Sequence, residues 1–161
     1  MPGVHRLGVI SDTHSLLRPE ALQALAGVEL IIHAGDVGSP LVLKGLVTVA
    51  PVVAVRGNVD RSALTGSLPE TEVVSIGEAR LFVLHDLEQL DLDPAAAGFG
   101  AVISGHSHAP VIRWLNGVLY LNPGSAGPRR FRHPVSLARL KVDGKRLTAE
   151  LVELEIPGDA A

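Results

Sequence analysis

The sequence predicts a two-sheet α/β sandwich, and three observations lead to this fold class. Hydrophobic residues make up 47% of the 161 residues and aromatic residues only 3%, so a core of Val, Leu, Ile and Ala is expected. Short apolar runs alternate with helical patterns in the first half of the chain, which is typical of parallel strands covered on both faces. The second half carries strand patterns joined by hairpin turns, which adds mostly antiparallel strands.

The first half of the chain alternates strands and helices. Continuous apolar runs predict strands at Leu7–Ile10, Leu30–Ile32 and Val52–Val55. Leucines at helical spacing, with a proline at the start and a glycine after the end, predict a helix over Arg18–Ala26. A serine that can cap the helix and a following proline predict a second helix over Pro40–Leu46. This order of elements favours a parallel sheet.

Seven further strands are predicted in the second half, where short apolar runs lie between turn residues. They span Thr71–Ile76, Arg80–Leu84, Ala101–Ile103, Val111–Leu115, Val118–Leu121, Val135–Val142 and Arg146–Leu154. Asn116-Gly117 and Asp143-Gly144-Lys145 are expected to form the turns of two hairpins. An Asp cap followed by proline predicts a short helix start over Asp93–Ala97. We expect the whole chain, 1–161, to form one domain, with a frayed tail over Pro157–Ala161.

Composition and charge limit the classes of partner. The net charge of −3 and the pI of about 6.1 argue against a basic surface that wraps long nucleic acid. The absence of cysteine excludes disulfides and thiolate metal sites. The sequence shows neither a signal-peptide pattern nor an apolar run of about 18 residues. We therefore expect a cytoplasmic protein that does not bind or span a membrane.

Residue types that bind metals recur directly after the predicted strands. They are Asp12, His14, Asp36, Asn58, Asp60, His85, Asp86, His106 and His108. Ligands gather at the carboxyl ends of strands in open α/β sheets, so these side chains are expected to converge. Nitrogen and oxygen donors without sulfur indicate manganese, iron, zinc or nickel, not a structural zinc finger. Two ions about 3.5–4 Å apart can hold both the attacking and the leaving oxygen of a displacement.

The order of these motifs resembles that of a known family. The motifs are Gly8–His14, Gly35-Asp36, Gly57-Asn58, Gly105–His108 and Asn122–Ser125. Together they are similar to the motif series of calcineurin-like metallophosphoesterases, and most similar to a branch of small bacterial and archaeal phosphodiesterases. That branch shares its fold with the retromer scaffold subunit of eukaryotes. The resemblance runs from about Leu7 to Arg129.

The resemblance implies a role for each motif residue. One metal ion would be held by Asp12, His14 and His108, and the other by Asn58, His85 and His106. Asp36 would bridge the two ions. The reaction implied is phosphodiester hydrolysis by a hydroxide that bridges two divalent ions, with manganese favoured and nickel, zinc or iron as alternatives. Asp36, Asn58 and His106 would then also be catalytic.

Two departures from the family pattern narrow the chemistry. Val59 stands where many relatives carry a histidine after the Gly-Asn pair. Leu87 stands where branch members carry the second imidazole of a His-Gly-His run, although His85 is kept. Both changes remove a proton donor near the leaving oxygen. The expected substrate is therefore a small phosphodiester, a nucleotide-like compound or an activated ester.

Several other residues have a structural interpretation as well as a functional one. His33 is interpreted as a packing or orienting residue, and Asp60 and Asp86 as orienting or turn residues. The Asn122–Ser125 motif reads as a structural turn. Arg129, Arg130 and Arg132 could meet a phosphate or simply be solvated. Arg56 is an equally plausible phosphate contact and is counted among the expected catalytic residues.

The alternatives to a phosphodiesterase are a metal-poor interaction scaffold on the same fold, a phosphomonoesterase and a nuclease. A scaffold need not keep a complete ligand set, and here all seven ligand positions are filled by the required residue types. A homodimer is compatible with the sequence, which does not fix the oligomeric state.

Overall fold

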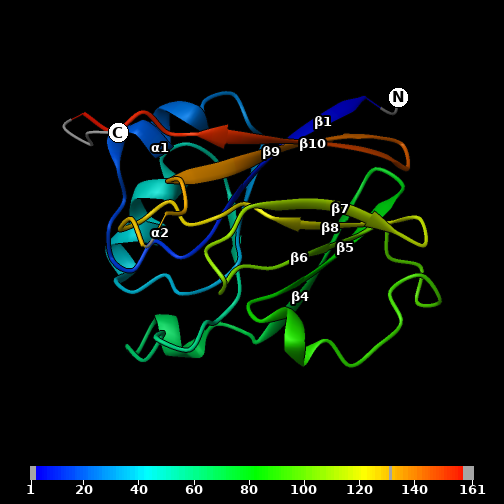
Figure 1. The fold of residues 1–161 in the computed structure, drawn as a ribbon, viewed down its shortest axis with the longest axis horizontal. Helices are drawn as coiled ribbons and strands as arrows, with labels where there is room; N and C mark the ends of the chain where they lie inside the picture. Colours follow the sequence, from blue (N-terminus) through cyan, green and yellow to red (C-terminus); the bar gives the residue numbers. More distant parts are fainter. Residues whose placement is uncertain (1–2, 131, 158–161) are drawn as a thin grey trace.

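The computed structural model describes residues 3–130 and 132–157, and in this part of the chain two five-stranded sheets face each other (Figure 1). The first sheet has the strand order β10-β9-β1-β2-β3. Its strands are β1 (Val4–Ile10), β2 (Leu30–His33), β3 (Val52–Ala54), β9 (Ser136–Asp143) and β10 (Arg146–Glu153). The second sheet has the order β4-β5-β6-β8-β7. Its strands are β4 (Thr71–Ile76), β5 (Ala79–Leu84), β6 (Ala101–Ile103), β7 (Val111–Leu115) and β8 (Val118–Asn122). The predicted two-sheet sandwich is confirmed.

Strands β1, β2 and β3 are parallel neighbours, as the apolar runs predict. The helices α1 (Pro19–Ala24) and α2 (Pro40–Val47) connect them. The Ser39 hydroxyl accepts a hydrogen bond from the Leu41 N–H and so caps α2 as expected. Helix α1 is shorter than predicted because its last turn tightens, with the Ala26 N–H donating to the Gln23 carbonyl.

The strands of the second half are mostly antiparallel, as predicted, but the middle of the second sheet is parallel. Strand β6 pairs in parallel with β5 on one side and with β8 on the other. All three residues of β6 are buried, because the first sheet covers one face and a loop covers the other. Burial on both faces is typical of parallel strands. The two predicted hairpins, β7–β8 and β9–β10, are antiparallel as expected.

The short helix predicted over Asp93–Ala97 is wrong, since the chain there forms a turn. The Asp93 carboxylate does cap it, accepting from the Ala95 N–H at 3.1 Å. The Ala97 N–H donates to the Asp93 carbonyl, but Gly98 then takes a φ of +84° and ends the turn. Single 3₁₀ turns occur at Thr65–Ser67 (η1) and Leu87–Gln89 (η2).

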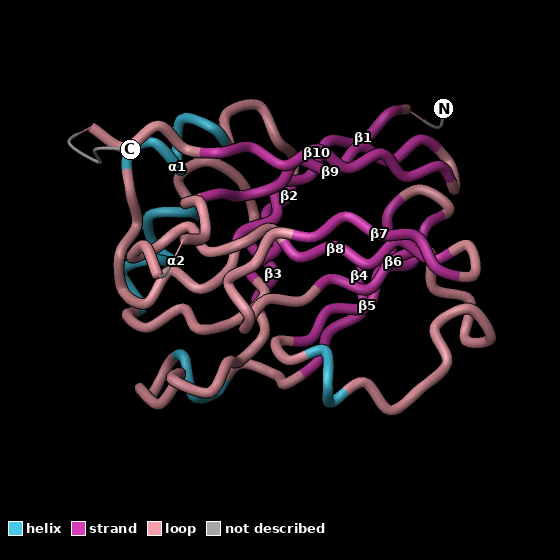
Figure 2. Tube along the Cα trace, viewed as in Figure 1, coloured by secondary structure: helices cyan, strands magenta, loops and turns pink. Residues whose placement is uncertain are grey.

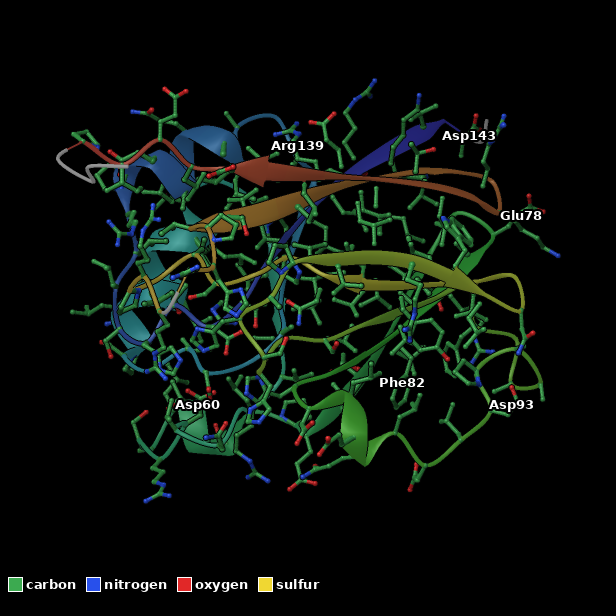
Figure 3. All side chains as sticks on the ribbon, viewed as in Figure 1. Asp60, Glu78, Phe82, Asp93, Arg139 and Asp143 are labelled. Atoms are coloured by element: carbon green, nitrogen blue, oxygen red, sulfur yellow. The ribbon has the colours of Figure 1, made fainter. Side chains whose placement is uncertain are left out.

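Three apolar clusters hold the layers together. The central cluster joins the facing sides of the two sheets, with Val9 and Ile32 from the first packed among Leu81 and Ile103 from the second. A second cluster packs α1 and α2 on the outer face of the first sheet. A third lies on the outer face of the second sheet, around Phe82. Figure 3 shows side chains filling the space between the sheets.

The loops that follow the parallel strands β1, β2 and β3 lie on the side of the molecule where α1 and α2 lie (Figure 2). Among the described helices, neither is long and apolar enough to cross a bilayer. Of the predicted frayed tail, residues 158–161 lie outside the described residues.

Candidate metal centre

The loops after four strands, β1, β2, β5 and β6, bring six of the seven predicted ligands together in two groups. Within each group the potential ligand atoms all lie within 4.8 Å of one another. The first group is Asp12, His14 and His108, and the second is Asp36, His85 and His106. Both groups combine residues that follow strands of the first sheet with residues that follow strands of the second.

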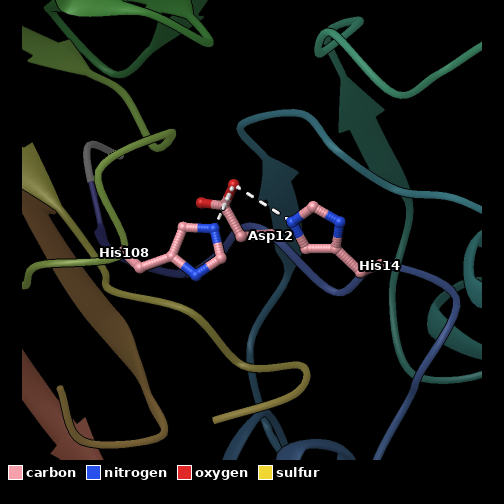
Figure 4. Close-up of side chains that lie close together, drawn as sticks. All are labelled: Asp12, His14 and His108. Carbon is pink, nitrogen blue, oxygen red and sulfur yellow. Dashed lines mark ion pairs between the residues drawn. The ribbon is translucent and has the colours of Figure 1, made fainter. Parts of the chain in front are cut away.

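The first group is centred on the Asp12 carboxylate (Figure 4). Asp12 Oδ1 lies 3.5 Å from His108 Nε2 and 3.9 Å from His14 Nε2. The other oxygen, Oδ2, accepts hydrogen bonds from the Ser11 hydroxyl at 2.8 Å and from the His106 N–H at 3.1 Å. These bonds fix the carboxylate and leave Oδ1 directed at the two imidazoles.

The second group is built around His85 Nε2. His85 Nδ1 donates to the Ala34 carbonyl at 2.8 Å, so Nε2 faces Asp36, to which it donates when protonated and beside which it can act as a ligand when it has lost that proton. This Nε2 lies 3.2 Å from Asp36 Oδ2, 3.3 Å from His106 Nδ1 and 3.1 Å from Asn58 Oδ1. The Asn58 oxygen therefore faces other acceptor atoms, a contact that is unfavourable as it stands. A cation bound between these atoms would make it favourable, and so would rotation of the amide so that its NH₂ group donates to them.

The Asp36 carboxylate lies between the two groups. Its Oδ2 is 3.6 Å from His14 Nε2 in the first group and 3.2 Å from His85 Nε2 in the second. Its Oδ1 accepts from the Val59 N–H at 3.0 Å, which fixes the orientation. This is the position that a ligand shared by two ions requires.

The backbone at the candidate ligands is left-handed, a feature that sequence reasoning missed. Seven non-glycine residues among those described have a positive φ, and five of them are candidate ligands. These five are Asp12 (55°), His14 (46°), Asp36 (57°), His106 (70°) and His108 (63°). Non-glycine residues rarely take this conformation, and its clusters mark functional sites.

Burial sets the protonation of the acidic ligands. It raises the pKa of Asp12 to about 6, because Oδ1 loses hydration without gaining a hydrogen bond. Burial acts in the same direction on Asp36, but hydrogen bonds from His85 and the Val59 N–H lower its pKa to about 2. Both carboxylates are therefore mainly ionised at neutral pH, as metal binding requires.

Burial also keeps two of the imidazoles neutral. Together with the nearby Arg130 charge, it lowers the pKa of His108 to about 4, and burial is the main cause of the lowered pKa of His14. At His85 burial again favours the neutral form, but the hydrogen bond with Asp36 outweighs it and raises the pKa. The carboxylates thus favour a positive charge at the centre.

The donor set fits divalent cations. Within the described part of the chain, three buried side-chain nitrogen or oxygen atoms have no hydrogen-bond partner: Asp12 Oδ1, His14 Nε2 and His108 Nδ1. All three belong to the first group, and two of them face its interior. An unpaired buried carboxylate oxygen is costly, and a cation would satisfy it. Nitrogen and oxygen donors of this kind suit manganese, iron, zinc or nickel.

His33 lies outside both groups and connects the loops that carry them. The Gly35 N–H donates to His33 Nδ1 at 3.1 Å, so the proton of the neutral ring is placed on Nε2. Nε2 then donates to the Thr13 hydroxyl at 3.0 Å, and that hydroxyl donates to the Val37 carbonyl at 2.9 Å. The ring is fully buried, and its burial lowers its pKa to about 3. These contacts agree with the interpretation of His33 as a packing or orienting residue.

The stability of the metal-free protein should depend on pH through His33. The unfolded histidine binds a proton below about pH 6.5 while the folded one does so only below about 3, so stability falls as the pH falls through this window. The free-energy difference between wild type and His33→Gln should shrink by up to about 1.4 kcal/mol for each pH unit. Denaturant titrations from roughly pH 6 to 4.5 measure it. A difference that does not change with pH would contradict a neutral buried His33.

Asp60 positions backbone rather than an imidazole. Its carboxylate accepts from the Gly57 N–H at 2.8 Å, the Gly38 N–H at 2.9 Å and the Val37 N–H at 3.2 Å. It therefore connects the loop that carries Asp36 to the loop that carries Asn58. These contacts agree with the interpretation of Asp60 as an orienting or turn residue, although the sequence did not indicate that it joins two loops.

The Asn122–Ser125 motif has a structural role, as interpreted. The Asn122 amide donates to the Gly105 carbonyl at 2.9 Å and to the Ser107 hydroxyl at 3.1 Å. The Ser125 hydroxyl donates to the Asp12 carbonyl at 3.0 Å. The motif thus holds the histidine loop against the Asp12 loop.

A polar cavity of about 530 Å³, called here the first cavity, opens beside the second group. It is lined by Asn58, His85 and His106, with Asp60 and Phe82, which are labelled in Figure 3. Its volume is in the range of small-molecule sites. A compound in this cavity would lie directly against the candidate ligands.

Of the predicted phosphate-contacting arginines, Arg56 also lines the first cavity. Its guanidinium donates hydrogen bonds to the Glu70 carboxylate at 2.6 Å and to the Gly66 carbonyl at 3.0 Å. A contact between Arg56 and a phosphate therefore stays a prediction. Arg130 lies close enough to lower the pKa of His14 and His108. Arg132 is exposed.

The two positions that depart from the family pattern supply no proton donor. The Val59 side chain is 40% exposed, and the backbone N–H of Val59 donates a hydrogen bond to the Asp36 carboxylate. Leu87 is 36% exposed and begins η2. Asp86 caps this turn by accepting from the Glu88 N–H, and its other oxygen lies 4.0 Å from His106 Nε2.

Comparison with known proteins agrees with this arrangement. A probable metallophosphoesterase of Methanothermobacter thermautotrophicus is 40% identical, over 94% of each chain. A phosphodiesterase of Methanocaldococcus jannaschii is 31% identical, over 74% of this chain and 82% of its own. The structure of vacuolar protein sorting 29 from Cryptosporidium parvum has the same fold, with a TM-score of 0.76 at 20% identity over 95% of this chain and 99% of that one.

The family model of the calcineurin-like phosphoesterase superfamily domain matches residues 6–145. That range contains both candidate ligand groups. The use of divalent metals by this family agrees with the two clusters of potential ligands. This chain belongs to the calcineurin-like phosphoesterase superfamily.

Proposed function

We propose that this protein is a dinuclear metal-dependent phosphodiesterase. The observation that carries the proposal is the Asp36 carboxylate between two complete ligand groups, one of which contains unpaired buried atoms. The 31% identical relative named a phosphodiesterase supports the choice of substrate class. Manganese is the favoured metal, with nickel, zinc or iron as alternatives.

Two divalent ions bound in these groups would supply Lewis acidity towards the phosphoryl oxygens and a nucleophile at neutral pH. The chain's own residues position the reactants. Asp36, Asn58 and His106 border the first cavity or lie directly behind it, where the phosphoryl group would bind. His106 is 46% exposed, so substrate can reach it. Arg56 would contact the phosphate only after exchanging its ion pair with Glu70.

The substrate class can be tested with chromogenic esters. With Mn²⁺, the protein should cleave bis(nitrophenyl) phosphate at least about tenfold faster, in kcat/KM, than nitrophenyl phosphate. This ranking rests on the 31% identical relative named a phosphodiesterase. Both esters release the same nitrophenolate, so the absence of an imidazole at Val59 and Leu87 should show instead in esters of poorer leaving groups, since a general acid contributes about 10²–10⁴ to the rate. Rates on monoesters should also fall steeply as the pKa of the leaving group rises. Faster cleavage of the monoester would count against a diesterase.

Metal stoichiometry separates the enzyme from the interaction scaffold. Elemental analysis of the saturated protein should find about two transition-metal ions per chain if both groups bind. A scaffold on the same fold should hold far fewer. A side-by-side assay of cyclic nucleotides, dinucleotides and single strands then distinguishes a phosphodiesterase from a nuclease.

A further inference from the structure

A second cavity, of about 350 Å³, lies beside the first. His106 and Asp86 line both cavities, so these two side chains form the ridge between them. The remaining wall of the second cavity comes from η2, β7, β8 and the loop that follows β6. A molecule bound against His106 can therefore extend in two directions.

The second cavity presents apolar surface. Leu87 and Val111 are 36% and 40% exposed, and they face it together with Tyr120 and Leu121. The Arg113 guanidinium lies over the Tyr120 ring, 5.9 Å from its centroid. The Asn122 amide also lines the cavity but already donates to the Gly105 carbonyl and the Ser107 hydroxyl. Such a wall suits a planar apolar group.

The wall of the first cavity is different in kind. Beyond the candidate ligands and the apolar Phe82 and Leu84, it presents mainly polar side chains, among them Thr71, Gln89 and Asp91. The two cavities thus suit two chemically different groups on either side of the His106 ridge.

We infer that the second cavity binds one ester substituent of a phosphodiester, a planar apolar group such as an aryl ring or a nucleobase. The inference rests on the proposed function. A diester places two substituents on one phosphorus atom, and the structure offers two cavities on either side of one candidate ligand. A monoester would leave one of them without a substituent. Leu87, which replaces an imidazole of the family pattern, then contributes to substrate choice by supplying apolar surface.

Neighbouring residues on β7 provide a matched pair of variants. Val111 and Ile112 are 40% and 39% exposed, and successive side chains of a strand point to opposite faces. Val111 lines the second cavity, and Ile112 is not among its lining residues. Val111→Glu and Ile112→Glu therefore add the same charge at the same exposure, with only the first reaching the cavity.

The experiment measures the Kd of diphenyl phosphate and of dimethyl phosphate for the metal-loaded protein. Burial of an aryl ring should make diphenyl phosphate bind at least about tenfold more tightly than dimethyl phosphate to wild type. Val111→Glu should reduce this ratio to about threefold or less, and Ile112→Glu should keep it. The ratio corrects for a general effect of the added charge, because both probes are monoanions.

A ratio that is equal in wild type and both variants would overturn the inference, as would a loss of equal size in Ile112→Glu. Turnover of bis(nitrophenyl) phosphate by the same wild-type samples tests the proposed function separately. Protein that shows the predicted binding ratios but cleaves no phosphoester would refute the proposed function and keep the cavity assignment. Protein that cleaves diesters but shows no effect of Val111→Glu on the binding ratio would refute the cavity assignment and keep the proposed function.

Discussion

Replacement of Asp36 by alanine is expected to abolish phosphoesterase activity and to lower the occupancy of both metals. One oxygen of this carboxylate lies 3.6 Å from His14 Nε2 and 3.2 Å from His85 Nε2, so a single side chain serves both groups. Its loss removes negative charge from between two cations, and kcat/KM should fall by at least about a hundredfold. Elemental analysis and steady-state kinetics on the same preparation measure both effects.

Asp91→Ala is the matched control for this variant. Asp91 is an exposed carboxylate that lines the first cavity but belongs to neither ligand group. It should keep both metals, and its rate should stay within a few-fold of wild type. His33→Gln should also cost less than Asp36→Ala, because His33 acts through Thr13 and Gly35. Full metal content and full rate in Asp36→Ala would show that the bridge assignment is wrong.

Local sequence patterns were sufficient for most of the fold. The Asn116-Gly117 hairpin is an example, since both residues have a positive φ, 52° and 77°, as this type of turn requires. The direction of β6 was not predictable, because its partners Leu119–Leu121 are selected by tertiary packing. The helix predicted at Asp93–Ala97 had a capping residue but no long apolar face to extend it.

The candidate site was predictable as far as residue types go. Asp, His and Asn at strand ends carry a chemical signal that is independent of the fold. The role of Asp60 was not predictable, because its partners Val37 and Gly38 are distant in the sequence. The left-handed backbone at His106 and His108 also has no signal in their side-chain types.

Gly57→Ala is expected to inactivate the enzyme although it removes no functional group. A Cβ at this position would overlap the backbone nitrogen and Oδ1 of Asp36 and would lie 2.8 Å from its Cγ. The Asp36 carboxylate would have to move, and the Asn58 oxygen with it. Activity should fall by at least about tenfold, since displacement of positioning groups by about 1 Å can cost 10²-fold. The free energy of unfolding should also fall by about 1–3 kcal/mol.

Gly66→Ala provides the comparison. Its nearest neighbour would be the Arg61 carbonyl carbon at 3.5 Å, an ordinary contact. This variant should therefore keep the activity of wild type. Kinetics and denaturant titrations of the two variants measure the difference. Equal activities would show that the loop tolerates the methyl group and that Asp36 is not held by close packing against Gly57.

The composition of the two ligand groups has a mechanical consequence. Asp12, His14 and Asp36 follow strands of the first sheet, while His85, His106 and His108 follow strands of the second. A cation held in either group would thus cross-link the two halves of the sandwich at one end. Its binding energy would then add to the cohesion between the layers, in proportion to RT ln(1 + [M]/Kd). The supply of metal would then set the free energy of unfolding of the protein as well as the activity that we propose for it.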